Sequence, residues 1–306
     1  MNKLEANISL LAIVFFSSFQ CVFLSGIPED ISAFLFLCVT NFVGFIITTA
    51  FFYNDLFRID AEQIKQSAII SLELIGFNLF LLFGAYDVVP SLIASVSASY
   101  FVFVMLIESV IFRTVPKLNN FISVIIVLTG LIIFSISDLK GLLNIKILYL
   151  MISDIFFAIY TITLSNYSKS SNPAVLAMGQ TFFCFVFSLI LWVLECLITG
   201  RNFEFPMDKR FLGSVIYTSF FIRGLFGIIQ MYAQRYLTAL NTSLIFSSAL
   251  IITMIISPLL TSEFGIKTDV LTFSKIFGGI VITIGLLTME PELFKFLRSL
   301  KHVGKN

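Results

Sequence analysis

Three charged residues, Glu73, Asp154 and Arg223, lie deep inside long apolar segments of this 306-residue sequence. A charge at the centre of a bilayer costs about 2.5–3.5 kcal/mol on insertion scales, so it persists there only by pairing or by facing a watery cavity. An arginine at such a depth can hold an anionic group, for example a carboxylate or a phosphate. Asp154 or Glu73 would then bind a substrate cation or take up a coupling proton.

Asp154 and Arg223 fall near the middle of their apolar segments, residues 145–165 and 212–234. Because a helix rises about 1.5 Å per residue, the two side chains would lie at a similar depth. A second interpretation is therefore open, in which they form a buried ion pair that joins the two segments and never touches a ligand.

Helical spacing predicts that both segments present one polar face. In residues 145–165 small or polar positions recur at i, i+4, i+7 and i+11, and a similar stripe in residues 212–234 contains Arg223 and Gln230. Because a helix in lipid turns its polar stripe toward protein or water, both segments should line one hydrophilic cavity. The residues predicted to line it are Asp154, Arg223, Glu73, Gln230, Asn78, Tyr160 and Gln180.

The composition excludes a water-soluble enzyme. The chain is 58% hydrophobic, its mean hydropathy is +1.02 and only 12% of its residues are charged, against roughly 25% in soluble proteins. The one histidine, His302, lies in the tail, and the four cysteines lie in apolar runs without metal-ligand spacing. We therefore expect no enzyme, no metal site and no cofactor. A net charge of +1 offers no surface for nucleic acid.

Apolar runs of about 20 residues, the length that crosses a bilayer, occur ten times. They are residues 7–25, 31–53, 67–86, 90–112, 119–137, 145–165, 174–197, 212–234, 238–261 and 270–289. An even number of spans places both termini on one side. The lysines and arginines near the span ends favour the cytoplasm for that side, by eleven residues to six. Glu195 and Lys275 lie near span ends and are expected to reach the membrane interface.

Two pairs of residues repeat with the same spacing. Glu108 precedes Gly130 by 22 residues, and Glu263 precedes Gly285 by 22 residues. The first glutamate would lie near the cytoplasmic face and the second near the outer face, as two five-helix halves of opposite orientation require.

A glutamate that closes the fourth span of each half, followed by a glycine within the fifth, resembles the EamA-like family of the drug/metabolite transporter superfamily. The short join at residues 84–90 and the Ala158-x-Tyr160 pair are also similar to that family. The resemblance implies ten helices in two inverted five-helix repeats. It also implies structural roles for the landmark residues Glu108, Glu263, Gly130 and Gly285.

The sequence departs from that family at two points. The arginine often found in the second span is missing, and so is the proline usual in the middle of the fourth and ninth spans. Pro258 stands near the end of the ninth span instead, where it is a candidate hinge or a fixed kink. The family's substrates are therefore not carried over.

The sequence as a whole predicts an all-α integral membrane protein of ten transmembrane helices. Residues 1–140 and 141–290 form the two repeats, and residues 291–306 form a basic cytoplasmic tail. The predicted function is secondary active transport of a small polar metabolite across the plasma or inner membrane by alternating access, and the resemblance alone favours export. A coupling proton and a homodimer stay open as partners. The alternative is a signalling, channel or lipid-modifying protein with a structural Asp154–Arg223 pair.

Overall fold

A computed structural model of the chain describes residues 1–28, 30–113, 118–135, 145–200, 205–263 and 269–289. These residues form helices and their connections, and no strand occurs among them. The prediction of an all-α integral membrane protein is confirmed. The basic tail at 291–306 lies outside the described residues.

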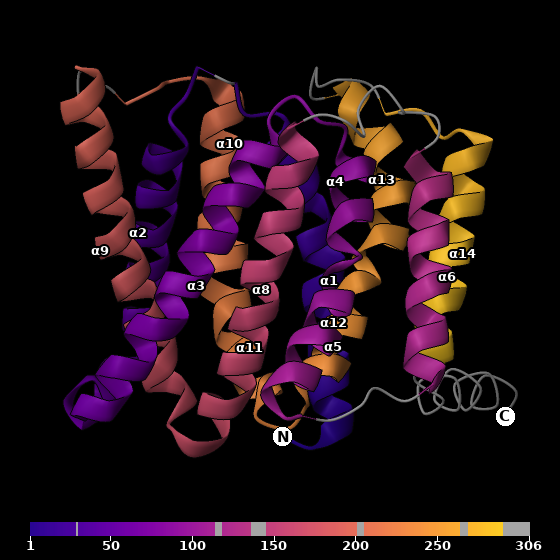
Figure 1. Cartoon of the computed structure of the whole chain (residues 1–306). Helices are drawn as coiled ribbons and strands as arrows, with labels where there is room; N and C mark the ends of the chain where they lie inside the picture. Colours follow the sequence, from indigo (N-terminus) through magenta and orange to yellow (C-terminus); the bar gives the residue numbers. More distant parts are fainter. Residues whose placement is uncertain (29, 114–117, 136–144, 201–204, 264–268, 290–306) are drawn as a thin grey trace, which may run out of the picture.

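The helices are long rods that lie side by side (Figure 1). In chain order they are α1 (Lys3–Ser25), α2 (Ala33–Phe52), the 3-10 helix η1 (Tyr53–Arg58), α3 (Ala61–Ala85), α4 (Pro90–Ser97), α5 (Tyr100–Ile111), α6 (Leu118–Ser135), α8 (Ile145–Ser170), α9 (Pro173–Thr199), α10 (Lys209–Tyr217), the π-helix η3 (Thr218–Phe226), α11 (Gly227–Gln234), α12 (Ala239–Ser247), α13 (Ala249–Glu263) and α14 (Phe273–Met289).

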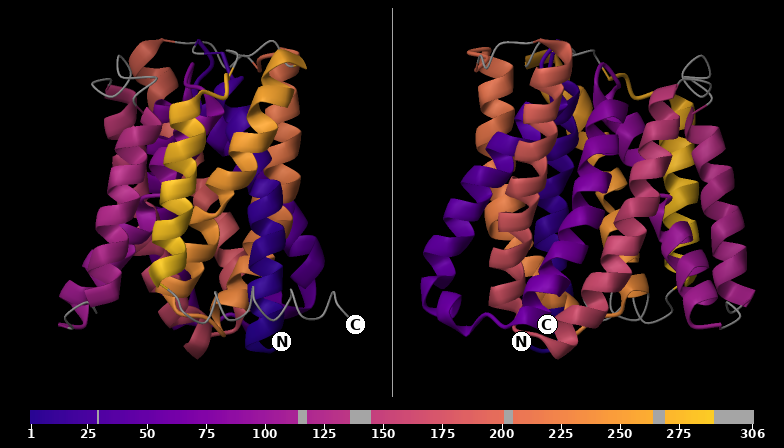
Figure 2. Two further views of the ribbon diagram at one scale, coloured as in Figure 1. Left: turned by 90° about the vertical axis from the view of Figure 1, so that its right-hand side faces the viewer. Right: turned by 60° about the vertical axis from the view of Figure 1, so that its left-hand side comes forward.

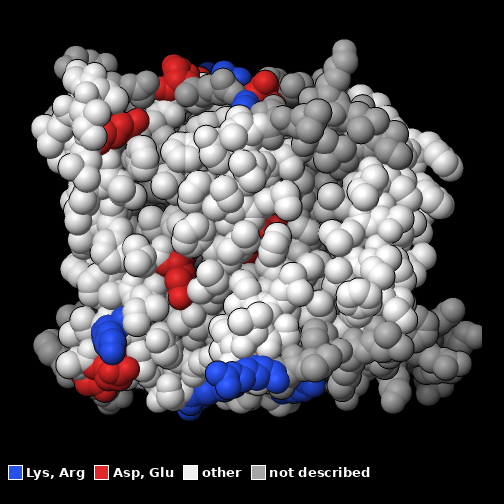
Figure 3. Space-filling model, in the orientation of Figure 1, with Lys and Arg blue, Asp and Glu red and all other residues white. Residues whose placement is uncertain are grey.

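Eight helical stretches of the described chain are long and apolar enough to cross a membrane. The other two apolar helices, α6 and α14, are shorter within the described residues. The count of ten membrane-crossing helices therefore stays a prediction. Charged side chains gather at the two ends of the bundle, and only isolated acidic atoms interrupt the uncharged band between them (Figure 3).

The chain begins and its last helix ends on the same face of the bundle, called here the N-terminal face; the opposite face is called the far face (Figure 1). Polar caps fix several helix ends. Asn2 accepts from the Glu5 amide in a capping box that starts α1, and Asp60 does the same for α3 through Gln63. Gly200 closes α9 with φ of 66°, which glycine adopts without strain.

Two segments that the sequence predicts as continuous spans are interrupted. The first breaks at Ala98 and Ser99, between α4 and α5, and the second at Ser248, between α12 and α13. Serine hydroxyls contribute to these breaks because they bond to carbonyls of the preceding turn, as Ser95 does to Leu92 (2.9 Å) and Ser248 to Ile245 (2.6 Å). Pro258 lies inside α13, ten residues beyond the break.

The two breaks contact each other across the bundle. The Ser247 hydroxyl donates to the Ala98 carbonyl at 2.9 Å, and the Tyr100 hydroxyl donates to the Thr242 carbonyl at 3.4 Å. The segment α4–α5 runs from the far face to the N-terminal face, whereas α12–α13 runs in the opposite direction (Figure 1). Two antiparallel broken helices therefore meet inside the protein.

Helices α6 and α14 form a closely packed pair at one edge of the bundle (Figures 1 and 2). A Cβ added to Gly278 would lie 2.5 Å from the Phe134 amide nitrogen, and one added to Gly130 would lie 2.8 Å from the Ile282 amide nitrogen. A Cβ on Gly285 would lie 2.6 Å from Val127. Glycine therefore allows these two backbones to approach closely.

A cluster of polar residues ties α4, α13 and α14 together near the far face. Asp269 accepts from the Ser91 amide (2.9 Å), from the Ser257 hydroxyl (2.6 Å) and from Lys275 Nζ (2.9 Å). Lys275 and Asp269 are each only 3% exposed. The expectation that Lys275 reaches the membrane interface is wrong, because a buried carboxylate holds its ammonium group inside the protein.

Candidate polar cavity

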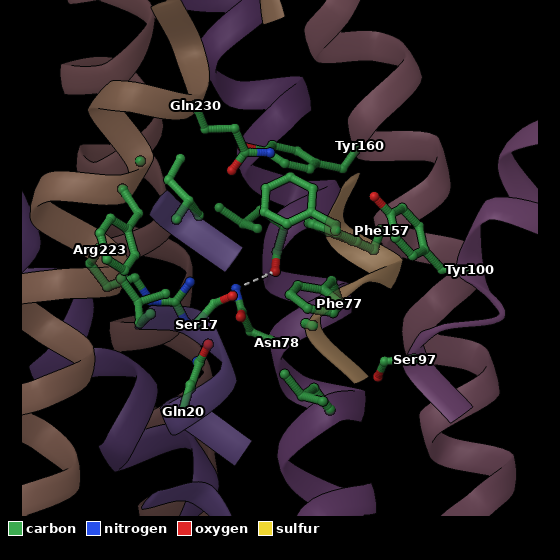
Figure 4. A pocket seen from close by; sticks show the side chains of 18 of the residues that line it. Ser17, Gln20, Phe77, Asn78, Ser97, Tyr100, Phe157, Tyr160, Arg223 and Gln230 are labelled. Carbon is green, nitrogen blue, oxygen red and sulfur yellow. Dashed lines mark hydrogen bonds between the residues drawn. The ribbon is translucent and has the colours of Figure 1, made fainter. Parts of the chain in front are cut away.

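A cavity of about 160 Å³ lies among the helices. Its walls come from α1, α2, α3, α4, α5, α8, α9, η3, α11, α12 and α13, but not from the α6–α14 pair. Figure 4 shows Arg223 on one side of this cavity and Tyr100 on the other, with Gln230 and Gln20 toward its two ends.

The structure brings together six of the seven residues that the sequence predicts for the cavity. They are Asp154, Arg223, Gln230, Asn78, Tyr160 and Gln180. All six are at least nine-tenths buried, so their polar groups face the cavity or one another and have little contact with the exterior.

Glu73 does not line the cavity. It accepts a hydrogen bond from Thr163 of α8 at 3.0 Å and is only half-buried. Residues five apart on a helix point about 140° away from each other, and Asn78 takes the side of α3 that faces the cavity. Glu73 therefore lies at the interface between α3 and α8.

Arg223 sits inside the π-helix η3, which interrupts the regular helix that the sequence predicts for residues 212–234. Single π turns inside α-helices occur frequently at functional sites. The side chain is 7% exposed, its Nε has no hydrogen-bond partner, and among the described residues it makes no ion pair. A buried guanidinium without a counter-ion is unusual in a folded protein.

Asp154 does not pair with Arg223 in this structure. Its carboxylate accepts instead from the Ser99 hydroxyl at 3.3 Å, beside the break between α4 and α5. Tyr100, the next residue along the chain, lies across the cavity from Arg223 (Figure 4). The structural ion pair is therefore not formed here, since the Asp154 carboxylate bonds to Ser99 and no ion pair joins it to Arg223.

The other polar groups are partly satisfied by the protein. Tyr160 donates to the Gln180 carbonyl oxygen at 3.1 Å, the bond that is dashed in Figure 4. Asn78 donates to the Leu74 carbonyl at 2.6 Å. By contrast, Nε2 of Gln230 has no partner although the residue is only 9% exposed.

Aromatic rings form one wall of the cavity and centre on Phe157. Its ring stacks on Phe77 with centroids 4.4 Å apart and on Tyr160 at 5.7 Å. Tyr100 at 5.0 Å and Phe246 at 5.9 Å complete the group. The cavity thus joins an aromatic, apolar wall to a few separated polar groups, which is typical of small-molecule sites.

Several polar lining residues escaped the sequence analysis. They are Ser17, Gln20, Asn41 and Ser97. On α1, the lining positions Ile13, Ser17, Gln20 and Leu24 follow the helical spacing i, i+4, i+7 and i+11. That spacing was a usable signal, but uncharged side chains do not stand out in an apolar segment as charges do.

The predicted structural residues lie away from the cavity. Glu108 is half-buried near the end of α5, and Gly130 and Gly285 lie in the α6–α14 contact. Glu263 is the last residue of α13, and its side chain is outside the described part of the structure.

An all-helical chain with helices long and apolar enough to cross a membrane has the architecture of a multi-pass membrane protein, and its described part encloses a polar cavity. Residues 144–289 match the model of the EamA-like transporter family. The resemblance to that family within the drug/metabolite transporter superfamily is thereby confirmed.

Two known proteins are similar over most of the chain. An "uncharacterized transporter" of Archaeoglobus fulgidus is 22% identical over 286 residues, which cover 94% of this chain and 85% of the relative. One crystal structure is 13% identical and superposes with a TM-score of 0.64, covering 93% of this chain and 98% of the other. That second likeness shows that the two proteins share a fold.

Proposed function

We propose that this protein is a secondary transporter that moves a small polar metabolite by alternating access. The observation that carries the proposal is the buried cavity, which helices from both halves of the chain surround and which contains unpartnered polar groups. Transporters of this kind place the substrate site near the middle of the membrane, between repeated halves and beside broken helices.

The proposal includes two inverted repeats, residues 1–140 and 141–290, with five helices crossing the membrane in each. The two broken spans support it, because each breaks eight or nine residues after it begins and they run in opposite directions (Figure 1). The pairing of α6 with α14, the last helix of each half, agrees with the same symmetry. The family match at 144–289 nearly coincides with the second repeat.

We place the N-terminal face in the cytoplasm. The helix ends and connections on that face carry positive residues that favour a cytoplasmic location, among them Lys65, Arg113, Lys169 and Arg235. Outward movement of the substrate is the direction we propose.

The size of the cavity favours a small substrate. A cavity of about 160 Å³ has room for roughly ten water-sized probes. A solute the size of an amino acid or a small organic acid fits this space.

Asp154 is the residue that we propose for the coupling proton. It is a carboxyl group inside the membrane, 1% exposed, and it lies on the cavity wall beside a broken helix. Asp154→Asn should abolish accumulation driven by a pH gradient while exchange of substrate for substrate continues. Loss of both activities in a folded variant would argue against this assignment.

Counterflow in proteoliposomes tests the proposed function. Purified protein is reconstituted, and a panel of radiolabelled amino acids, organic acids, nucleosides, sugar phosphates and quaternary amines is offered against the same unlabelled solute inside. Saturable counterflow of one solute supports transport. No counterflow of any solute by protein shown to be folded would favour a signalling, channel or lipid-modifying role.

A further inference from the structure

Within the described part of the chain, no acidic side chain forms an ion pair with Arg223. Its guanidinium group makes no hydrogen bond and no ion pair with the described residues, although only 7% of the residue is exposed. Burial of a charged group without hydrogen bonds costs free energy. Such a group is therefore expected at a site where a bound ligand supplies the missing hydrogen bonds and the opposite charge.

The neighbouring helix α2 explains the direction in which Arg223 points. A Cβ on Gly44 of α2 would lie only 2.5 Å from Cβ of Arg223, and one on Gly224 would lie 2.9 Å from Ile47. Helix α2 contains no charged residue. The close approach leaves no room for a counter-ion on this side, so the guanidinium group is directed into the cavity.

A second unpartnered donor belongs to the same wall. Nε2 of Gln230 has no hydrogen-bond partner, and Gln230 lines the cavity two helical turns beyond Arg223. Asp154 makes no ion pair with Arg223, and its carboxylate accepts from Ser99 instead. The guanidinium group of Arg223 and the free Nε2 of Gln230 both donate hydrogen bonds. Together they suit a carboxylate, whose two oxygens accept several hydrogen bonds at once.

We propose that the cavity binds a small organic anion, with its carboxylate or comparable group at Arg223 and Gln230 and its apolar body against Phe157. Gly44 is the positioning residue that aims Arg223. The proposal rests on the proposed transport function and specifies its substrate class. The rings around Phe157 offer an aromatic surface for the apolar body of such an anion.

Three probes of similar shape but different charge test this site. Benzoate, benzamide and benzylammonium are titrated by calorimetry into the full chain in lipid nanodiscs. Benzoate should bind roughly ten- to hundredfold more tightly than the other two, because only it offers an acceptor with full negative charge to Arg223. Arg223→Gln should remove that preference, and Arg223→Lys should restore part of it.

Gly44→Ala tests the positioning role. The added methyl group should displace Arg223 and reduce the ratio of benzoate to benzamide affinity by about tenfold, a ratio that a general loss of stability would not change. Gly213→Ala is the matched control, because it adds the same methyl group to α10, where nothing lies within 4 Å. It should leave the ratio unchanged.

Equal or tighter binding of benzylammonium would overturn the proposal, and so would unchanged benzoate binding by Arg223→Gln. Failure of all three probes to bind folded protein would also overturn it. Saturable counterflow of a cationic or neutral solute, together with any of these results, would leave the transport function standing and remove only the anion site.

Discussion

Two buried cations of this protein have opposite surroundings. Lys275, near the far face, lies 2.9 Å from Asp269, which also accepts from Ser257 and from the Ser91 amide. Arg223, in the cavity, has no such partner among the described residues, although it is almost as deeply buried. The protein therefore supplies a counter-ion to Lys275, whereas no described residue supplies one to Arg223.

The difference is the one expected between a structural charge and the binding charge that we propose. A paired and hydrogen-bonded ion holds helices in place, and removal of one partner leaves the other stranded. An unpaired ion stabilises nothing in the empty protein and gains its partner only from outside. Replacement of Lys275 by methionine should therefore lower stability. Replacement of Arg223 by methionine should raise stability and remove ligand binding.

Lys275→Met should have the largest effect. It leaves the Asp269 carboxylate buried without its cation, which should lower the free energy of unfolding by about 3–5 kcal/mol. Denaturant unfolding in detergent micelles measures this change. The double variant Lys275→Met with Asp269→Leu is the control and should regain most of the loss. A single variant as stable as the parent protein would remove the structural role of the pair.

Ser257→Ala should have the next largest effect. It removes a 2.6 Å hydrogen bond to the Asp269 carboxylate, and bonds to charged groups contribute about 1.5–3 kcal/mol. Ser248→Ala is the matched control at the junction of α12 and α13, since its hydroxyl bonds only to the Ile245 carbonyl of the preceding turn. Equal losses for the two variants would show that the carboxylate gains nothing from Ser257.

The sequence was sufficient to place Arg223 at the cavity but not to find the partner of Lys275. Arg223 stood out because a charge in the middle of an apolar segment is rare, and helical spacing placed Gln230 on the same face. Lys275 lies near a span end, where snorkelling to the interface was the simpler prediction. Its partner Asp269 lies in a connection, and no helical spacing relates a connection to the helices that it touches.

The breaks in the fourth and ninth spans were also beyond sequence reasoning. Ser99 and Ser248 stand in apolar segments of helical character, and serine is common where helices pack closely. The contact between Ser247 and Ala98 that joins the breaks spans 149 residues, so local propensity carries no information about it. The overall helical class was predictable because apolar length alone determines it.

Arg223→Met should raise stability rather than lower it. Replacement of an unsatisfied buried charge by an apolar side chain should add about 1–3 kcal/mol to the free energy of unfolding. The same variant should lose the binding of benzoate. Unfolding of parent and variant without added anion, under the conditions used for Lys275→Met, gives the comparison. A loss of stability would mean that Arg223 has a structural partner.

The dependence of the Asp269 contribution on pH should be the smallest effect. Burial would raise the pKa of Asp269, but hydrogen bonds from Lys275, Ser257 and Ser91 outweigh it, and the pKa lies below its ordinary value of 3.8. A carboxyl group whose pKa is lowered by folding stabilises the protein above its unfolded pKa and loses that contribution as the pH falls through its folded pKa.

The difference in unfolding free energy between the parent protein and Asp269→Asn isolates this contribution. It should stay constant between about pH 5 and pH 8 and shrink only below about pH 4, where the unfolded chain already binds the proton. Lys275→Met removes a cause of the low pKa of Asp269, so in that background the loss at low pH should shrink or reverse. A difference that grows between pH 6 and pH 5 in the parent protein would mean that the folded pKa lies above the unfolded one and that Lys275 does not hold Asp269 in its charged form.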